Sequence, residues 1–298
     1  MTPGIHLFHK QVGPTSFAIV KQCIASLGDQ RGKVRTRLCH GGTLDPFAHG
    51  LLLILVGQAT KLFDHLHAVP KVYEATVRWG VETDNGDASG RVMFEGDAST
   101  LSSSQLDDAI GACIGWRDQV PPATSAKRIG GERAYAKAHR GEPVDLPPSR
   151  VYLHEATWLR HDLPHESTLR IVVRGGYYVR SLARELGRTL GCGAHLTTLH
   201  RTAIGPWTDP GPDRRVALRG RDLLPWAASR ELSDHEVGEL RQERSIPMGQ
   251  LLSPDWRVPE EFPDPDAAVR GFHRNKLVFL LRREGERLAV LTVLSGGL

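Results

Sequence analysis

His40–Gly50 reads H-G-G-T-L-D-P-F-A-H-G, and the apolar and polar stretch L-L-L-I-L-V-G-Q-A-T-K-L follows it over 51–62. The one carboxylate in the first stretch, that of Asp45, lies in a loop bounded by glycine and proline. Glycine reaches backbone angles closed to other residues and proline fixes φ, so such a loop presents a side chain rather than building a core. An isolated aspartate in a loop of this kind often forms an Asx turn that caps the next element. From these residues alone, Asp45 is either a turn residue or an active-site carboxylate.

The composition is that of an ordinary globular protein. The chain has 298 residues, of which 40% are hydrophobic and 24% charged, and these values argue against disorder. The length leaves room for one large domain and a small one. The net charge of +4 and the pI near 9.0 are compatible with a polyanionic partner without establishing one.

Basic residues gather in particular segments. Four lie within 31–37 without an acid, and six arginines lie within 170–201 against the single acid Glu185. A basic run of this kind is ordinarily a solvated face. Several such runs in a chain with a candidate active-site aspartate favour contacts with phosphate groups instead.

The four cysteines show no spacing typical of a disulfide framework or of a zinc ribbon. Cys192-Gly-Ala-His195 and Cys39-His40 have a superficial metal-ligand spacing, but we interpret them as buried thiols and loop histidines and expect no metal. The N-terminal residues carry no pattern of a secretory signal, and the longest apolar run, 51–56, is too short to cross a bilayer. We expect a cytoplasmic protein without a membrane-spanning segment.

Periodicity predicts both helices and strands. Apolar residues at helical spacing predict helices over 15–27, 104–114 and 178–190. Alternation and β-branched residues predict strands over 72–81, 151–159 and 168–173, with a turn-rich loop over 82–90. Their uneven order predicts a mixed α+β fold rather than a doubly wound parallel sheet.

Proline, glycine and charge suggest the domain organisation. The basic segment 121–148 begins and ends with two prolines, which is typical of an excursion from the core. Proline and glycine gather again over 205–213, and the segment 216–228 is compatible with packing on the first domain. A helical segment and two strands, 277–283 and 288–294, predict a small β-rich module after about residue 231. We expect a large domain over 1–230, with an insertion at about 121–148, and a small domain over 231–298.

Several separated motifs occur along the chain. The longest is G-T-L-D-P-x-A-x-G-L-L-x-x-x-x-G-x-A-T-K-L over 42–62. The others are G-I and G-P-T-S at 4–5 and 13–16, K-V-Y at 71–73, the segment 121–141 with Ser125-Ala126, Gly131, Tyr135, Ala138 and Gly141, Y-V-R at 178–180, L-G at 186–187, G-C-G-A-H-L at 191–196, and Leu199 and Arg201. In this order, the motifs resemble those of the TruB family of tRNA pseudouridine synthases. The resemblance implies a mainly antiparallel pseudouridine-synthase sheet, an insertion that covers RNA, and a PUA-like C-terminal module.

The resemblance also implies roles for individual residues. Asp45 would be the catalytic carboxylate, Tyr73 would stack on the target base and assist the proton step, and Arg180 would pair with Asp45. Without it, Tyr73 would be interpreted as a packing residue of a strand and Arg180 as a surface charge. His40 would fill the space of the everted base, and Tyr178 and Leu199 would line its pocket. The RNA backbone would be contacted by Arg174, Arg184, Arg188, Lys127 and Arg128.

Two positions depart from the family pattern. The usual Asp-Lys-Pro near the start is His9-Lys10-Gln11, which lacks the rigidity of proline. The tyrosine usual in the P-x-x-Y-S-A segment is Thr124, which removes an aromatic surface from the insertion. We expect weaker tRNA affinity for this reason, improved by Thr124→Tyr.

The resemblance implies conversion of the uridine at conventional position 55, in the T-arm of tRNA, to pseudouridine. This isomerisation involves no redox change and no energy input, so we expect no cofactor. We expect no obligate protein partner. Two alternatives stay open: a non-catalytic tRNA-binding protein or folding chaperone on the same fold, and a guide-RNA-dependent relative that acts on ribosomal RNA.

Overall fold

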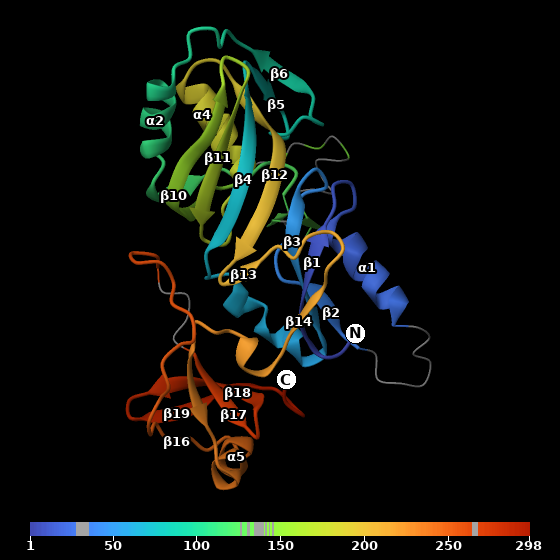
Figure 1. Cartoon of the computed structure of the whole chain (residues 1–298), viewed down its shortest axis with the longest axis vertical. Helices are drawn as coiled ribbons and strands as arrows, with labels where there is room; N and C mark the ends of the chain where they lie inside the picture. The colour runs from blue at the N-terminus through green and yellow to red at the C-terminus, as the bar shows by residue number, and fades with distance from the viewer. Residues whose placement is uncertain are drawn as a thin grey trace. The chain divides into compact units, whose positions relative to one another are not determined.

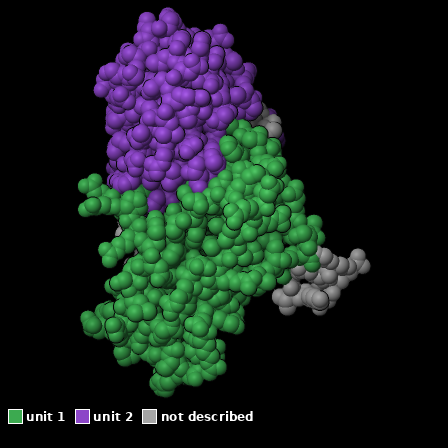
Figure 2. All heavy atoms as spheres, viewed as in Figure 1, with its two compact units in different colours: residues 1–69, 203–298 green, residues 70–202 purple. Residues whose placement is uncertain are grey.

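A computed structural model describes residues 1–27, 36–125, 127–129, 132–133, 140, 142, 144, 146–263 and 268–298. The chain divides into two compact units (Figure 2). The first unit comprises residues 1–69 and 203–298, and the second comprises residues 70–202. The site residues predicted from the sequence are divided between the two units.

The first unit is built around a strand that is apolar on both faces. β3 (His49–Val56) pairs antiparallel with β1 (Gly4–Lys10) and with β2 (Leu38–His40). A strand covered on both faces reads as a continuous apolar run rather than an alternating one. The remaining elements of this part of the unit are β13 (Trp207–Thr208), β14 (Val216–Leu218), η1 (Gly57–Leu62), η2 (Asp64–Leu66) and η3 (Gly220–Asp222).

Helix α1 (Ser16–Ser26) covers one face of β3. Thr15 caps this helix, because its side chain accepts a hydrogen bond from the backbone N–H of Ala18. Val20 and Cys23 of the helix pack with Leu52 and Ile54 of the strand. The first residue of the helix, Ser16, is hydrogen-bonded to the backbone of Leu44, directly before Asp45.

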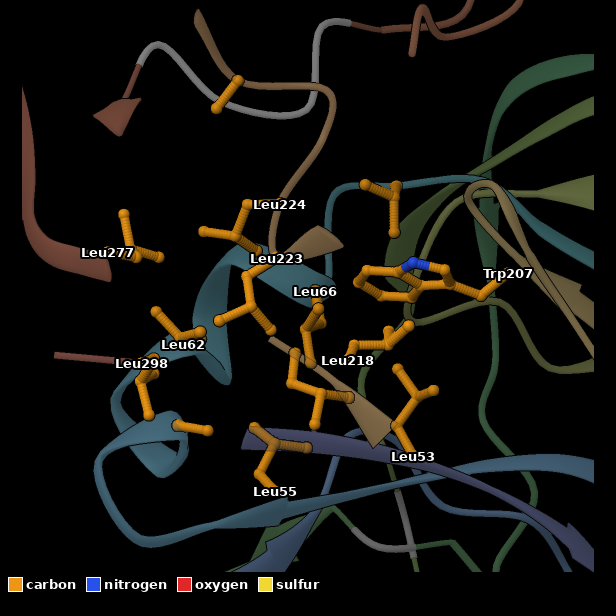
Figure 3. Close-up of a cluster of buried hydrophobic side chains, with 14 of the residues drawn as sticks. Leu53, Leu55, Leu62, Leu66, Trp207, Leu218, Leu223, Leu224, Leu277 and Leu298 are labelled. Carbon is orange, nitrogen blue, oxygen red and sulfur yellow. The ribbon is translucent and has the colours of Figure 1, made fainter. Parts of the chain in front are cut away.

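The other face of β3 belongs to a larger core, shown in Figure 3. Leu53 and Leu55 pack there with residues of η1 and η2, with Trp207 and with Leu218. Leu277 and Leu298, near the C-terminal end of the chain, belong to the same cluster. This core therefore joins residues from both sides of position 230.

The last part of the first unit is a five-stranded sheet with one helix. The sheet order is β15-β17-β18-β19-β16, in which the β15–β17 pair is parallel and the other described pairs are antiparallel. The elements are β15 (Ala228–Glu231), α5 (Asp234–Arg241), β16 (Ile246–Pro247), β17 (Val269–His273), β18 (Lys276–Glu284) and β19 (Arg287–Val293). Ser233 and Glu236 form a capping box at the start of α5.

The second unit is a sheet in the order β12-β4-β11-β10-β7. Its strands are β4 (Lys71–Trp79), β7 (Gly115–Gln119), β10 (Ser149–Asp162), β11 (Glu166–Val173) and β12 (Ala194–Ile204), the last of which continues into the first unit. A separate hairpin joins β5 (Val81–Thr83) and β6 (Val92–Glu95). Helices α2 (Ser103–Gly111) and α4 (Val179–Thr189) contact this sheet (Figure 1).

The mixed α+β class that the sequence predicts is confirmed, and so are the helices expected at 15–27, 104–114 and 178–190. The strands expected over 72–81, 151–159 and 168–173 are also present, although β10 is longer than expected. The short strands β15, β16 and β17 of the C-terminal sheet were not predicted. The expected domain division near residue 230 remains a proposal.

Only part of the segment between β7 and β10 is described. It contains a short hairpin of β8 (Arg128–Ile129) and β9 (Glu132–Arg133). Among the described residues, no helix has the length and hydropathy needed to span a membrane. In the same part of the chain, no group of three or more His, Cys, Asp or Glu residues is arranged to hold a metal ion.

Candidate active site

The backbone on the N-terminal side of Asp45 is fixed by a buried serine. The Ser16 hydroxyl accepts a hydrogen bond from the N–H of Leu44 at 2.8 Å and donates one to the Leu44 carbonyl at 3.0 Å. Both side chains are buried, so water does not compete for these bonds. The two hydrogen bonds fix the peptide groups directly before Asp45.

The backbone after Asp45 is fixed by a buried lysine. The Nζ atom of Lys10 donates to the carbonyls of Ala48 at 2.6 Å, Gln11 at 3.0 Å and Pro46 at 3.3 Å. Lys10 is fully buried, and three carbonyl acceptors supply the polar contacts that a buried ammonium group requires. The family pattern Asp-Lys-Pro is His9-Lys10-Gln11 in this chain. Its lysine is retained, and it supports the Asp45 loop.

Glycine is needed where the loop leaves β2. A Cβ atom at Gly41 would lie 3.0 Å from side-chain atoms of Leu53 and Leu66, tighter than ordinary packing allows. The next residue, Gly42, has a φ angle of +133°, which residues other than glycine rarely adopt. Asp45 itself is half-buried, at the point where the contacts of Lys10 and Ser16 converge. The loop presents one carboxylate on a fixed backbone.

His40 is the last residue of β2 and is half-buried. Its register partner is Ile54 of β3. His40 and Asp45 thus belong to the same unit, and the other predicted site residues all belong to the second unit.

In the second unit, Tyr73 lies on β4 and Leu199 on the neighbouring strand β12. Both side chains are buried. Each has a buried cation two residues away on its own strand, Lys71 next to Tyr73 and Arg201 next to Leu199. Burial, together with the charges of Arg201 and Arg174, lowers the pKa of Lys71 from 10.5 to about 7. Positive charge is concentrated at this end of the strands.

Arg180, in the first turn of α4, is 5% exposed, and its guanidinium group is held by acceptors from two loops. Its Nη1 atom donates to the hydroxyl of Thr124 at 2.6 Å and to the carbonyl of Asn85 at 2.8 Å. Its Nη2 atom donates to the carbonyl of Thr124 at 3.1 Å. A guanidinium group that makes several directed hydrogen bonds has little freedom to reorient.

The loop 83–90 contacts Arg180. The sequence identifies this loop only as turn-rich. The Oδ1 atom of Asp87 accepts hydrogen bonds from the N–H and the hydroxyl of Ser89, at 2.9 and 2.6 Å. The Oδ2 atom of Asp87 lies 4.0 Å from Nη1 of Arg180. Gly86 packs on the helix, since a Cβ atom there would lie 3.1 Å from the Cβ atom of Arg180. This loop positions a carboxylate and a carbonyl beside the guanidinium group.

Tyr178 is the N-cap residue of α4, and a buried glutamine holds its backbone. The amide of Gln119 accepts from the N–H of Tyr178 at 2.9 Å and donates to its carbonyl at 3.1 Å. The hydroxyl of Ser181 donates to the carbonyl of Val120 at 2.7 Å. The end of β7 therefore fixes the start of the helix that carries Arg180.

The residues predicted to contact the RNA backbone have different surroundings. Arg188 donates two hydrogen bonds to Glu82, at 2.9 and 2.6 Å, and Arg184 is half-buried beside the carbonyl of Val120. Lys127 donates to the hydroxyl of Ser149, and Arg128 belongs to β8. The basic run 31–35 and the motif residues Ala126, Gly131, Tyr135, Ala138 and Gly141 lie outside the described residues.

The segment G-C-G-A-H has a packing function. A Cβ atom at Gly187 would lie 2.2 Å from the N atom of Ala194, so helix and strand approach too closely for any other residue. All four cysteines are free thiols, and Cys192 is fully buried. The two histidines are not loop histidines as predicted, because His40 ends β2 and His195 is buried in β12, where its Nδ1 atom lies 2.8 Å from the carbonyl of Val81. Cys39, expected to be buried, is half-buried.

The predicted site residues are therefore divided between the two units, with His40 and Asp45 in the first and the others in the second. The pairing of Asp45 with Arg180 remains a prediction, because these residues belong to different units. Sequence reasoning missed the supporting residues Lys10, Ser16, Gln119 and Asp87. Ser16 and Lys10 belong to the opening motif, and D-N-G-D over 84–87 is a typical turn sequence, so these motifs contained a signal.

Comparison with known protein families identifies the class. Residues 31–179 match the TruB family pseudouridylate synthase (N terminal domain), and residues 180–219 match the tRNA pseudouridylate synthase B C-terminal domain. The first match alone covers half of the chain. The chain belongs to the TruB family of pseudouridylate synthases.

Similar proteins include several curated bacterial relatives. The tRNA pseudouridine synthase B of Corynebacterium efficiens is 34% identical over 297 residues, covering 97% of this chain and 95% of the relative. That of Nocardia farcinica is 40% identical over 257 residues, covering 84% of this chain and 82% of the relative. Among solved structures, a chain of the Cbf5-Nop10-Gar1 complex has a TM-score of 0.65 at 18% identity, covering 98% of this chain and 84% of that chain. This structural similarity shows that the two chains share a fold over nearly the whole length of this chain.

Proposed function

We propose that this chain converts the T-loop uridine at conventional position 55 of tRNA to pseudouridine, with Asp45 as the catalytic carboxylate. The observation that carries the proposal is the double clamp on the Asp45 loop. Ser16 binds the peptide groups on one side of Asp45, and Lys10 binds three carbonyls on and around the other side. An Asx turn needs no such support from segments distant in sequence. A catalytic group does need it, because its position must be fixed before the substrate arrives.

Three residues carry the proposed chemistry. Asp45 acts as the nucleophile or stabilises positive charge on the sugar. Arg180 pairs with Asp45 and keeps it ionised, and the acceptors Thr124 and Asn85 orient the Arg180 guanidinium for this purpose. Tyr73 stacks on the target base and assists removal of the C5 proton.

The reaction is an isomerisation, and its atoms balance within the nucleoside. The N1–C1′ bond of uridine breaks, the base turns over, and a C5–C1′ bond forms. The proton on C5 leaves and N1 gains one, so no oxidant, reductant or energy source is consumed. The chain is thus proposed to act without a cofactor.

The target base has to leave its stack before it can react, which costs a few kcal/mol. His40 is proposed to occupy the vacated position, and Tyr178 and Leu199 to line the pocket of the everted base. Arg174, Arg184, Arg188, Lys127 and Arg128 are proposed to contact phosphates of the T-arm. Such contacts fix register and give a marked salt dependence, whereas the shape of the arm selects the substrate.

We further propose that the chain acts in the cytoplasm and without an obligate protein partner. The free cysteines are in keeping with a reducing compartment. The two relatives described above are both named tRNA pseudouridine synthase B, which supports this proposal over the guide-RNA-dependent alternative.

Release of tritium from C5-labelled uridine tests the proposal. The purified chain is incubated with a tRNA transcript and with an isolated T-arm stem-loop, with no other protein or RNA added. We expect label release from both substrates, and no release from a stem-loop in which cytidine replaces the uridine at position 55. Binding without release would identify a non-catalytic tRNA-binding protein, and release only after addition of a guide RNA would identify the ribosomal RNA alternative.

A further inference from the structure

A cluster of aromatic and cationic side chains lies at the edge of the sheet of the second unit. One member, Arg174, is among the residues proposed above to contact the RNA backbone, and the other three have no role in the site described above. Trp116 is on β7, which is the last strand of the sheet order, and 45% of this large side chain is exposed. Tyr152 is its register partner on β10, and the two rings lie 5.2 Å apart between centroids. Neighbouring strands therefore hold two aromatic rings side by side on one face.

Two guanidinium groups lie over the Trp116 ring in cation–π geometry. Those of Arg150 and Arg174 each lie 6.0 Å from its centroid, one on β10 and the other just beyond the end of β11. Arg150 faces the carboxylate of Asp118 at 3.9 Å, but both groups are largely exposed, so this pair is weak. The cluster therefore keeps a positive character around an accessible indole.

Arg174 connects the cluster to the candidate active site. Its backbone N–H donates to the carbonyl of Tyr152 at 3.0 Å, which fixes it beside β10. Its charge is also one of those that act on buried Lys71, two residues before Tyr73. Within the described part of the chain, no group accepts a hydrogen bond from the buried Nε atom of Arg174.

We propose that Trp116, Tyr152, Arg150 and Arg174 form a stacking platform for an unpaired nucleobase of the RNA substrate, distinct from the pocket of the reacting uridine. The base lies on the exposed Trp116 ring, and the two arginines contact the phosphates on either side of that nucleotide. Aromatic rings flanked by cations are the general solution for binding single-stranded RNA, because every base has a π face and every nucleotide has a phosphate.

The alternative is that Trp116 merely covers the edge of the sheet. Edge strands do need protection, but a charged or small side chain provides it without exposing an indole. The placement of guanidinium groups from two different strands around one ring favours the platform. The occupant is RNA rather than a protein because the cluster combines cations with a flat aromatic surface, and because the chain belongs to a family of RNA-modifying enzymes.

This inference rests on the proposed function for the identity of the RNA, and binding measurements test it separately from catalysis. The dissociation constant for a fluorescent tRNA transcript is measured at fixed salt for the full-length chain, Trp116→Ala, Trp116→Phe and Phe17→Ala. Phe17 is the matched control: it is an exposed aromatic residue of the first unit with Lys21 above its ring at 5.1 Å. A thermal melt of each variant reports its folding.

Loss of one stacked base weakens binding about tenfold, so Trp116→Ala should raise the dissociation constant by about that factor. Trp116→Phe should remain within about threefold of wild type, Phe17→Ala should bind as wild type, and kcat at saturating tRNA should not change for any of them. Arg150→Gln should remove one phosphate contact, which lowers the slope of log affinity against log salt by about 1.

Wild-type affinity of Trp116→Ala would overturn the platform. So would an equal loss in Trp116→Phe with a lowered melting temperature, which would make Trp116 a structural residue, or an equal loss in Phe17→Ala, which would make the effect non-specific. If tritium release fails while Trp116→Ala still weakens tRNA binding, the proposed reaction is wrong and the platform stands.

Discussion

The Asp45 loop and the surroundings of Arg180 are held in place by different means. In the first unit, the hydrogen bonds of Ser16 and Lys10 go to the backbone of the loop. In the second unit, the side chain of Arg180 donates hydrogen bonds to Thr124 and Asn85. One region fixes a peptide segment from which a short carboxylate projects, and the other fixes the end of a long cation.

The difference follows from the two side chains. An aspartate has two rotatable side-chain bonds, so a fixed backbone already places its carboxylate within a small volume. An arginine has several more and would lose its position without acceptors at its tip. Substitutions near Asp45 should therefore affect folding and catalysis together, whereas those near Arg180 should affect catalysis with little loss of stability.

The largest effect on this comparison is expected from Arg180→Lys. Lysine keeps the charge but loses the planar fork that donates to Thr124 and Asn85 together. We expect kcat for pseudouridine formation to fall by about 10²–10³, with tRNA affinity within about threefold of wild type. Single-turnover rates and filter binding measure the two quantities. The matched control Arg91→Lys, at a side chain that is 78% exposed, should leave both unchanged, and a normal rate for Arg180→Lys would remove Arg180 from the chemistry.

A smaller effect is expected from Lys10→Met, which tests the backbone clamp. The variant keeps the buried volume but removes the donor to the carbonyls of Ala48, Gln11 and Pro46, of which Pro46 keeps the N–H of Gly13. We expect the free energy of unfolding to fall by about 1–3 kcal/mol and kcat to fall by about 10–100-fold. Urea unfolding and single-turnover rates measure these effects.

The control for Lys10→Met is Lys21→Met, because Lys21 is exposed on α1. It should change neither stability nor rate. If Lys10→Met lost stability but kept a normal rate, the clamp would serve folding alone.

Thr124→Val tests the clamp on the side chain of Arg180. It removes the hydroxyl that accepts from Nη1 at 2.6 Å and keeps the shape of the residue. Because hydrogen bonds to charged groups contribute about 1.5–3 kcal/mol, we expect kcat to fall by about tenfold, with rescue by Thr124→Ser. Equal activity of the Val and Ser variants would show that the hydroxyl is dispensable and that the carbonyl of Thr124 is sufficient to orient the Arg180 guanidinium.

Thr124→Tyr sharpens the same comparison, because the sequence and the structure assign Thr124 different roles. The missing aromatic ring predicts that this variant binds tRNA more tightly. The contact with Arg180 predicts that it turns over more slowly, since the phenol oxygen is too far from the backbone to replace the threonine hydroxyl. We therefore expect a lower KM and a lower kcat together. Unchanged or weaker tRNA binding would refute the role inferred from the sequence.

A separate effect is expected in the pH dependence of stability. The pKa of buried Lys71 is about 7, against an ordinary value of 10.5 for a lysine in the unfolded chain. Between these values the folded chain has released this proton and the unfolded chain still holds it, so unfolding takes up a proton and stability rises with pH. The slope for one group is at most about 1.4 kcal/mol per pH unit. Urea unfolding at pH 7, 8 and 9 should show a shallower rise for Lys71→Met than for wild type, and parallel curves would contradict the lowered pKa.

Much of the fold could be predicted because its elements carry local signals. The alternation that begins at residue 72 is strand β4, and the stripe of Val179, Leu182 and Leu186 is the buried face of α4. The short strands of the C-terminal sheet have no such signal. β15 and β16 are four and two residues long, and their pairing with β17 and β19 depends on segments far along the chain.

The candidate site could be predicted in its motifs but not in its supports. Asp45, Tyr73 and Arg180 stand out by the motifs around them, whereas Gln119 meets Tyr178 across 59 positions of sequence. The hydroxyl of Thr124 is a similar case: sequence comparison identifies only the absent aromatic ring. Contacts between distant segments depend on the tertiary fold, which no local pattern specifies.

The central claim is that Asp45, on its clamped loop, is the catalytic carboxylate for a uridine in tRNA. Single-turnover pseudouridine formation by Asp45→Asn, measured beside tRNA affinity and a thermal melt, tests it most directly. Asparagine preserves the size and the backbone of the loop but cannot act as a carboxylate. The account predicts wild-type folding and tRNA binding with a rate lowered by at least about 10⁴-fold, and a rate near that of wild type would contradict it.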